Sequence, residues 1–340
     1  MPRRPFRPRA PLPADRIRWP ADFGTRFVVF VDTEEEFDWG APLARDNRST
    51  STVAALPAAH ARFVAAGVPL ALMVDYPVAT DDAAIGHIAP LLAEPRTTVG
   101  AQLHPWVNPP YVEDLTPVNS FAGNLSRTVE AAKLDQLTAA ITDAFGRRPV
   151  AYRAGRYGLG PTSIALLAER GYRIDCSMRP AHDYSAEGGP DFSAIGNGAF
   201  RLGGMVELPL TSVFTGYARG IGNALYSAAG RVPKGRGILA RSGALSRVSL
   251  TPEGMPINEA IEAVRIAAGQ GERVLSFAFH SPSLVPGHTP YVRDGRDLAT
   301  FWRWWDRMLG ALDRLDIRAA GLAEVIAAAD QSLAASRIAD

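Results

Sequence analysis

The chain has 340 residues, and its 36 basic and 35 acidic residues give a formal net charge of +1. This balance lacks the basic excess by which proteins bind nucleic acids or anionic membrane surfaces, so we expect neither partner. Hydrophobic residues make up 47% and charged residues 21%, which is the composition of a folded chain. A chain of this length suits one α/β barrel and does not require a second domain.

The cysteine count and the hydropathy pattern exclude some kinds of site and of membrane segment. The single cysteine, Cys176, cannot form an intramolecular disulfide or a cysteine-based zinc site, so a metal would need His, Asp or Glu ligands. The N-terminus lacks the apolar core of a secretory signal, and no stretch of about 18 consecutive apolar residues occurs. We therefore expect a cytoplasmic protein without a membrane span.

The two ends of the chain differ from its middle. Residues 1–20 are rich in Arg and Pro, which predicts a basic disordered arm; binding of an acidic partner is the less favoured interpretation. The single folded domain is predicted to span 26–325, followed by a C-terminal tail at 326–340.

Apolar, strand-like runs alternate with helical patterns along this domain. The predicted strands are 26–33, 68–75, 97–104, 149–155, 172–177, 205–211 and 273–280. The predicted helices are 52–66, 81–94, 125–145, 161–170, 257–269 and 297–313, with a last short segment at 317–329. Such alternation implies parallel strands joined by right-handed crossovers. About seven repeats favour a closed (β/α)7-type barrel over an open doubly wound sheet.

One segment interrupts the alternation. Residues 214–256 are rich in Gly, Arg and Ser, which is typical of an insertion at one end of a barrel. A lid, a subunit contact and a plain surface excursion all fit this composition. No glycine-rich nucleotide-binding loop follows the first strand, which argues against a nucleotide site.

Polar side chains follow the apolar runs, where parallel α/β proteins place their chemistry. Asp32 ends the first strand and Glu34 lies two residues on, so both carboxylates can share one face. Gln102 and His104 have the same spacing on the third strand. A neutral imidazole with carboxylates suits Zn²⁺ or a similar divalent ion. We predict a metal site formed by Asp32, Glu34 and His104.

Further strand ends carry charged groups. Arg153 ends the fourth strand and could hold a carboxylate through paired hydrogen bonds. Asp175 follows on the next strand, and the two could instead form a purely structural ion pair. His280 ends a late strand and is a candidate general acid or base.

These strand ends resemble the motifs of the polysaccharide deacetylase superfamily, also called the NodB homology domain, and most of all its divergent WalW-like branch. The family carries an Asp general base beside a metal-binding Asp, a His-x-x-x-His metal pair, an Arg that orients the base, an Asp or hydrophobic groove motif, and a late Leu and His. The motifs lie on a distorted seven-fold β/α barrel. The family removes acyl groups from amino sugars, and relatives cleave other non-peptide C–N bonds.

The resemblance covers most of 26–325 outside the insertion, but the metal positions differ from the family pattern. Asp32 matches the general base, and Glu34 could replace the metal-binding Asp, because Thr33 occupies that position. Gln102 occupies the position of the first metal His and Trp106 that of the second. Two nearby residues could replace these histidines: His104 as a metal ligand, and Asn108 as a weak ligand or a sugar contact.

The remaining motifs match more closely. Arg153 matches the motif that orients the base, Asp175 the fourth motif, and Leu275 with His280 the fifth. The resemblance implies that Asp32 is the base, that His280 protonates the leaving amine, and that Arg153 with Asp175 sets the protonation state of the site.

The implied substrate is a carbohydrate, an acylated amino sugar, cleaved at its amide bond with a divalent metal, zinc being favoured. Trp39, Trp106 and Tyr157 offer flat faces for stacking a sugar ring, and Gln102 and Asn108 offer polar contacts. Two alternatives remain open: a carbohydrate-binding barrel that has lost its metal, and an amidohydrolase acting on a small cytoplasmic amide.

Overall fold

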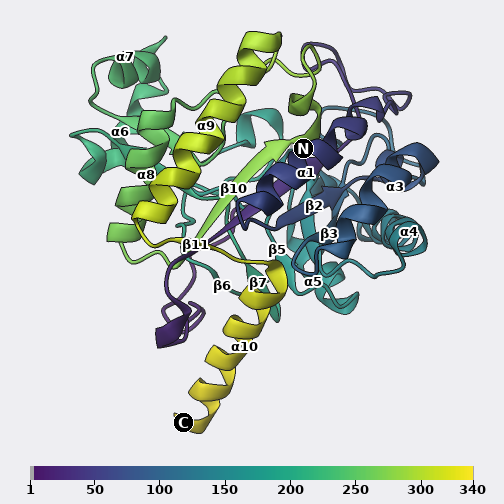
Figure 1. Cartoon of the computed structure of the whole chain (residues 1–340), viewed down its shortest axis with the longest axis horizontal. Coiled ribbons are helices and arrows are strands. Elements are labelled where there is room, and N and C mark those ends of the chain that lie inside the picture. Colours follow the sequence, from purple (N-terminus) through teal and green to yellow (C-terminus); the bar gives the residue numbers. More distant parts are fainter. Residues whose placement is uncertain (1–3, 340) are drawn as a thin grey trace.

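The computed structural model describes residues 4–339, with side chains described through residue 332. Its centre is a sheet in the order β10–β1–β2–β3–β4–β5–β7–β6 (Figure 1). Every pairing along this order is parallel except that of β6 with β7, and β11 pairs in parallel with β1. The predicted α/β architecture with parallel strands is confirmed. The strands are β1 (Arg26–Thr33), β2 (Leu70–Val74), β3 (Thr98–Leu103), β4 (Ala151–Ala154), β5 (Ile174–Asp175), β6 (Phe200–Leu202), β7 (Met205–Glu207), β10 (Val274–His280) and β11 (Arg318–Ala319).

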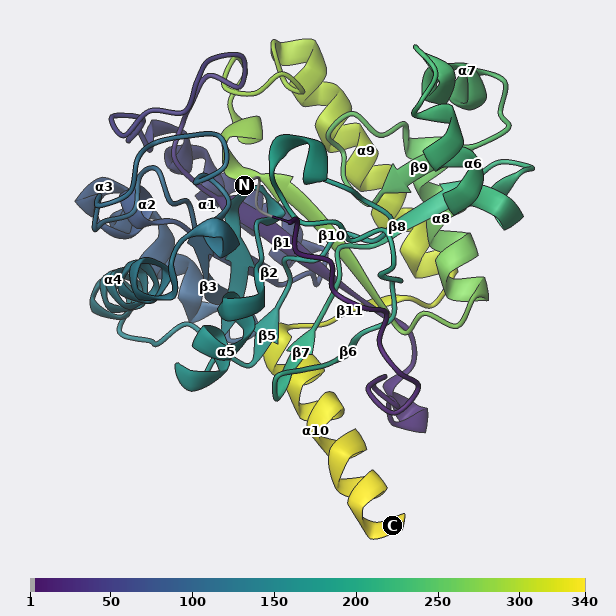
Figure 2. The same ribbon diagram turned by 180° about the vertical axis from the view of Figure 1, so that it is seen from behind.

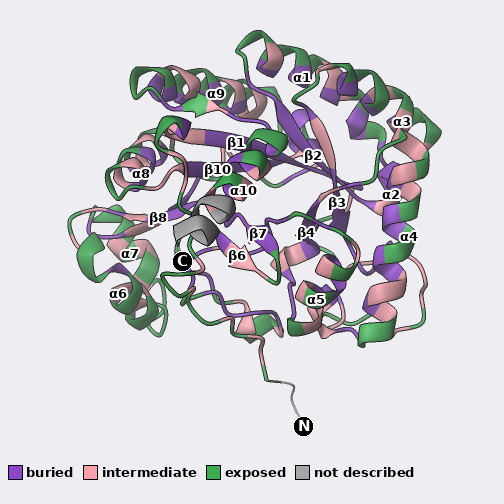
Figure 3. Cartoon of the chain, turned by 90° about the horizontal axis from the view of Figure 1, so that it is seen from below, coloured by how far each residue is buried: buried purple, intermediate pink, exposed green. Residues whose placement is uncertain are grey.

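Helices surround the outer face of this sheet, and their exposed sides face away from the buried strands (Figure 3). They are α1 (Leu56–Ala65), α2 (Tyr76–Ala79), α3 (Asp82–Ile88), α4 (Arg127–Phe145), α5 (Pro161–Glu169), α8 (Ile257–Gly269) and α9 (Gly295–Arg314). The last helix, α10 (Leu322–Ala339), instead packs against the inner cluster. The predicted helix at 81–94 divides into α3 and a 3-10 helix (Ala89–Ala93) that has Pro90 in its first turn. Proline lacks the N–H that a continuing α-helix requires.

Two hydrophobic clusters bury the two faces of the sheet. On β1, Val29 and Val31 belong to the outer cluster beneath the helices, whereas Val28 and Phe30 belong to the inner one. Successive side chains of a strand point to opposite faces, so a strand buried on both faces has a continuous apolar sequence. The same alternation carries Asp32 to the inner face at the end of β1.

The sheet curls into a half-barrel and does not close by strand pairing among the described residues. After β7 the chain enters β8 (Ser212–Thr215), which pairs antiparallel with β9 (Ser246–Ser249) and not with β10. Single hydrogen bonds span the opening: the Ala278 N–H donates to the Leu250 carbonyl at 3.1 Å, and the Ser276 N–H donates to Thr211 Oγ1 at 2.9 Å. The insertion thus occupies the place where one more parallel strand would close the barrel.

The predicted insertion at 214–256 folds as a small unit at the side of the half-barrel (Figure 2). It carries α6 (Gly222–Ala229) and α7 (Gly235–Arg241) between the two strands of the β8–β9 ribbon. The residues that follow β9 return to the half-barrel beside β10.

The composition of residues 1–20 predicts a disordered arm, but residues 4–20 lie along the domain. The Asp191 N–H donates to the Phe6 carbonyl at 2.9 Å, and the Ile17 N–H donates to the Ala199 carbonyl at 3.1 Å. Ile17 is buried in the inner cluster. Backbone hydrogen bonds and the apolar side chains of Phe6, Ile17 and Trp19 hold this segment despite its polar composition.

The predicted tail at 326–340 begins inside α10, and the last residue lies outside the described residues. Ala328 and Ala329 of this helix are buried in the inner cluster together with Val325. Within residues 4–339, no helix has both the length and the apolar composition that crossing a membrane requires.

Candidate active site

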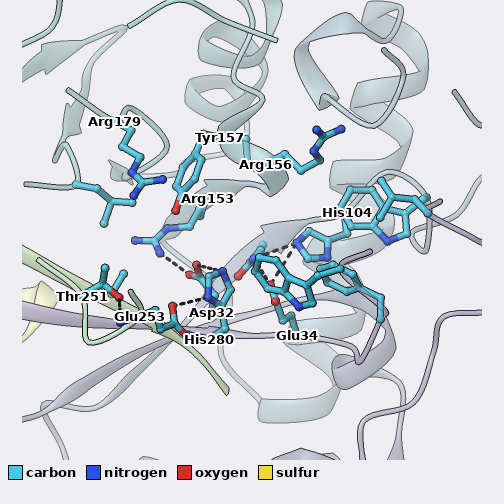
Figure 4. A pocket seen from close by; sticks show the side chains of 18 of the residues that line it. Asp32, Glu34, His104, Arg153, Arg156, Tyr157, Arg179, Thr251, Glu253 and His280 are labelled. Atoms are coloured by element: carbon cyan, nitrogen blue, oxygen red, sulfur yellow. Dashed lines mark hydrogen bonds and ion pairs between the residues drawn. The ribbon is translucent and has the colours of Figure 1, made fainter. Parts of the chain in front are cut away.

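A cavity of about 550 Å³ opens at the carboxyl ends of the strands. Asp32, Gln102, Arg153 and His280 line it, each from a different strand or strand end (Figure 4). Each side chain continues the inner-face alternation of its own strand, and parallel strands end at the same edge of a sheet. Strand-end residues that are distant in sequence therefore meet in one site.

Asp32 lies between two basic groups. Its Oδ1 accepts a hydrogen bond from Arg153 Nη1, and its Oδ2 lies 3.7 Å from His280 Nε2. Asp32 and His280 are paired residues of the parallel strands β1 and β10. Arg153 is only 1% exposed, so its positive charge acts on Asp32 with little solvent screening.

Glu253 orients His280 from the far side. Its Oε2 lies 2.7 Å from His280 Nδ1, and its Oε1 accepts the His280 backbone N–H at 3.0 Å. Burial by itself would lower the pKa of His280, but the negative charges of Glu253, Glu34 and Asp32 outweigh burial and raise the pKa to about 10. At neutral pH this imidazole is a cation that directs Nε2–H toward Asp32 and the cavity.

A second group of residues surrounds His104, which follows β3. His104 Nδ1 lies 2.7 Å from Glu35 Oε2, and Trp106 Nε1 donates to the other oxygen of Glu35 at 2.7 Å. The His104 and Trp106 rings stack with their centroids 4.4 Å apart. Because Nδ1–H donates to Glu35, the lone pair of His104 is on Nε2.

Gln102 and Glu34 occupy the space in front of His104 Nε2. Gln102 Nε2 lies 2.9 Å from Glu34 Oε2 and 3.0 Å from His104 Nε2. Glu34 Oε1 and Gln102 Oε1 are buried and have no hydrogen-bond partner. Burial is the main reason that the pKa of Glu34 is raised to about 7. A cation in front of this carboxylate would lower that pKa.

These atoms fit a divalent cation better than the acidic cluster behind them. Ligand atoms of Glu35, Asp75 and His104 lie within 4.8 Å of one another. Both oxygens of Asp75 already accept backbone N–H groups, from Glu35 at 2.7 Å and Val78 at 2.9 Å. The atoms without a partner are Glu34 Oε1 and Gln102 Oε1. His104 Nε2 accepts from the Gln102 amide and would join them as a ligand once that amide turns its oxygen toward the ion, which gives the mixture of oxygen and nitrogen that suits Zn²⁺.

Two features outside the cavity fix His104 in place. Lys133 of α4 is buried and donates to the carbonyl oxygens of Pro105, Asn108 and Pro110, so it holds the loop after β3. Gly155 lies directly behind the imidazole: a Cβ there would collide with His104 Cδ2 and lie 2.7 Å from the Leu103 carbonyl oxygen. Only glycine permits this approach.

Aromatic side chains form the cavity walls. Trp39 is 37% exposed and packs edge-on against His280 with ring centroids 5.0 Å apart. Tyr157 lines the opposite side and has a left-handed backbone, with φ at 59°. Trp106 also lines the cavity but is 1% exposed, so its ring mainly supports His104.

Comparison with solved structures relates this geometry to known folds. A proposed polysaccharide deacetylase from Mycobacterium smegmatis superposes with a TM-score of 0.52 at 16% identity, covering 96% of each chain. A proposed glycoside hydrolase/deacetylase from Parabacteroides distasonis gives a TM-score of 0.55 at 14% identity, covering 91% of this chain and 70% of the other. The chain has a deacetylase-type fold. No family model matches its sequence, and neither does any curated protein.

Two predicted residues of this deacetylase-type barrel lie outside the cavity. Asp175 is on β5 between Ile174 and Cys176, both of which face the inner cluster, so its side chain has the opposite orientation. It is hydrogen-bonded by Ser177, while Arg153 pairs with Asp32, which corrects the predicted pairing of Arg153 with Asp175.

Asn108 is also structural. It is fully buried and donates to the carbonyl oxygens of Pro109 and Lys133. Asn108 thus supports the loop after β3 and does not line the cavity. The predicted metal set changes too, because Asp32 pairs with Arg153 and His280, whereas Glu34 and His104 lie together.

The sequence did not indicate three residues of the candidate site. Asp75 is the last residue of the second predicted strand (68–75), so the strand-end criterion could have identified it. Glu35 stands beside Glu34 in an acidic run, and only its contacts with His104 and Trp106 distinguish it. Glu253 lies near the end of the insertion, in the loop between β9 and α8, where no sequence pattern indicates its contact with His280.

Proposed function

We propose that this protein is a metal-dependent hydrolase of the WalW-like kind that cleaves the amide bond of an acylated amino sugar. The arrangement that carries the proposal is Asp32 held between Arg153 and His280 on the wall of the cavity. A carboxylate and an imidazolium that face the same space can serve as general base and general acid for one reaction.

In the proposed reaction a water molecule adds to the acyl carbon and Asp32 accepts its proton. The C–N bond then breaks, and His280 gives its Nε2 proton to the leaving amine. Arg153 orients Asp32 by donating a hydrogen bond to its Oδ1. Glu253 keeps His280 protonated and directs Nε2 toward the reacting atoms.

Glu34, Gln102 and His104 would hold the metal ion. A divalent cation bound there would supply positive charge that stabilises the acyl oxygen as it becomes negative. Glu35 and Trp106 fix the imidazole so that Nε2 faces Glu34 and Gln102. Trp39 and Tyr157 offer faces on which a sugar ring can stack.

The test is acetate release from N-acetylglucosamine oligomers by the full-length protein loaded with Zn²⁺. The Asp32→Asn variant should lose about 10²–10⁴-fold in rate, the usual range for general acid–base catalysis. Asp38→Asn is the matched control, because it removes the same negative charge from an exposed residue at the mouth of the cavity. A metal-loaded protein that releases no acyl group from any acylated amino sugar would contradict the proposal.

One observation favours a second candidate, a carbohydrate-binding barrel that works without metal. The Gln102 amide nitrogen already bridges Glu34 Oε2 and His104 Nε2, so these two groups have a neutral partner in place of a cation. Elemental analysis of protein purified without chelator separates the two. Sugar binding by calorimetry without bound metal and without acetate release supports the binding barrel.

A further inference from the structure

Arg179 on the cavity wall has no acidic partner among the described residues. Its Nη1 donates to the Tyr184 hydroxyl at 3.3 Å and its Nη2 to Ser249 Oγ at 3.0 Å. Its Nε is buried and has no hydrogen-bond partner. The guanidinium also lies over the Tyr157 ring, 5.0 Å from the centroid. Neutral hydroxyls and an aromatic face thus fix its position without neutralising its charge.

The other two arginines of the cavity differ in this respect. Arg153 is paired with Asp32, and Arg156 lies 2.5 Å from Glu187. The charges of both are compensated within the protein. Arg179 alone of the three presents an uncompensated charge, and a half-buried charge of this kind is stabilised when a ligand supplies the counter-ion.

The surroundings of Arg179 reinforce its positive charge. Arg247 comes from β9 and donates to the Ala181 carbonyl at 2.5 Å, with no ion pair among the described residues. The pKa of His182 lies well below its usual value, firstly because it is buried and then because Arg179 and Arg247 repel a further proton. Between residues 208 and 252 the chain has six basic residues and no Asp or Glu. Glu253, the one acidic residue of the insertion, pairs with His280 on the other side of the cavity, so the insertion supplies no counter-ion to Arg179.

Arg179 is also placed to act on the same ligand as the catalytic groups. Figure 4 shows it on the side of the cavity that carries Tyr157 and Arg153, across from Glu253 and His280. The Tyr157 ring, which Arg179 covers, is one of the two walls proposed to stack a sugar. A charged substituent of a sugar held there would lie within reach of the guanidinium.

We propose that Arg179 binds an anionic substituent of the substrate, a carboxylate, sulfate or phosphate, so that the cavity selects acidic acylated amino sugars over neutral ones. This selectivity rests on the proposed function of the same cavity. Guanidinium groups bind such oxyanions through paired hydrogen bonds, and the unused Nε–H beside Nη2 offers one such pair.

Isothermal titration calorimetry with four probes tests the proposal on the full-length protein. The probes are N-acetylglucosamine, its 6-sulfate, its 6-phosphate and the corresponding uronic acid. At least one acidic probe should bind roughly 10- to 100-fold more tightly than the neutral sugar, as expected for hydrogen bonds to a charged partner. The three acidic probes identify which oxyanion the site prefers. Equal affinities for all four probes, or no measurable binding of any of them, overturn the proposal.

Variants assign the preference to one residue. Arg179→Gln should abolish the difference between acidic and neutral probes, and Arg179→Lys should keep part of it. Arg156→Gln is the matched control, because it removes the same charge from the same cavity at a residue that already has an acidic partner. Loss of the preference in Arg156→Gln but not in Arg179→Gln overturns the assignment.

Two further readouts keep the proposal testable whatever the variants do. If Arg179→Gln does not fold, the salt dependence of wild-type affinity decides: binding of the preferred acidic probe should weaken as salt rises, and unchanged affinity contradicts an ionic contact.

Acetate release from neutral oligomers without any acidic preference overturns only the selectivity. Acidic preference without acyl release from any probe instead contradicts the proposed hydrolase.

Discussion

Asp32 and His280 are paired residues of two adjacent parallel strands, and their side chains approach to 3.7 Å across the floor of the cavity. The two groups are 248 residues apart in the sequence, yet each is the last inward-facing residue of its apolar run. A base and an acid on neighbouring strand ends need no loop movement to reach the same substrate. This pair is therefore the rigid part of the proposed mechanism.

The first prediction concerns the proton on His280. Glu253→Gln removes the carboxylate that contributes most to raising the pKa of His280, so the alkaline limb of the pH–rate profile should move to lower pH. Steady-state rates between pH 6 and about 11 measure that limb. Ser283→Ala, which removes another partner of Glu253 without changing charge, is the control. An alkaline limb that stays in place would show that another group gives the proton.

The second prediction concerns stability and pH. The pKa of His280 is about 10 in the folded state, above the ordinary value of about 6.5. The folded state therefore holds this proton more tightly, and its stabilising contribution is complete below about pH 6.5 and is lost as pH rises to about 10. Burial also raises the pKa of Glu34 to about 7 and that of Glu35 to about 8, which acts in the same direction from about pH 4.5 upward.

Urea unfolding of the metal-free protein from pH 5 to pH 10 measures this dependence. The free energy of unfolding should fall steadily over the range, and the fall should be smaller in Glu34→Gln, which has no carboxylate to ionise. Stability that rises between pH 6 and pH 9 would contradict the assignment of raised pKa values to these groups.

The third prediction concerns the metal. Zn²⁺ should bind more tightly at pH 8 than at pH 5.5 and should release protons, because the Glu34 carboxyl must ionise first. Gln102→His replaces a bridging amide by an imidazole and should raise the affinity at least about 10-fold. His104→Ala should abolish binding. Calorimetry in two buffers of different ionisation enthalpy measures both the affinity and the proton count.

The fourth prediction concerns Gly155. Gly155→Ala should destabilise the protein by roughly 1–3 kcal/mol and weaken Zn²⁺ binding, because the new Cβ displaces His104 and presses on the Leu103 carbonyl. Gly86→Ala is the control: it lies in α3 with open space around its Cβ position and should be neutral or slightly stabilising. Unfolding in urea compares the two variants.

The fifth prediction concerns the N-terminal segment. Ile17→Ala should destabilise the protein by roughly 1–3 kcal/mol, because it removes a buried side chain from the inner cluster. Leu12→Ala, at an exposed leucine of the same segment, should change stability by less than about 0.5 kcal/mol. Equal, negligible effects would restore the interpretation of residues 1–20 as a free arm.

The sequence alone determined the parallel architecture and most of the site. Apolar runs that end in Asp32, His104, Arg153 and His280 place these residues on one sheet edge, since parallel strands end together. The alternation of side chains along each strand is local, so it can be recognised without knowing the fold. The same alternation predicts that Gln102, two residues before His104, faces the site as well.

Tertiary structure alone decided what depends on register and on distant segments. Asp175 lies outside the cavity because its neighbours Ile174 and Cys176 face the inner cluster. Successive side chains of a strand alternate, so a shift of one residue turns a side chain to the other face. Glu253, Arg179 and the arm reach their partners through loop conformation, which no periodic pattern encodes. Whether the barrel closed depended on β8 pairing with β9 and not with β10. Which distant strands pair depends on their tertiary contacts, so it cannot be predicted from the sequence of one strand.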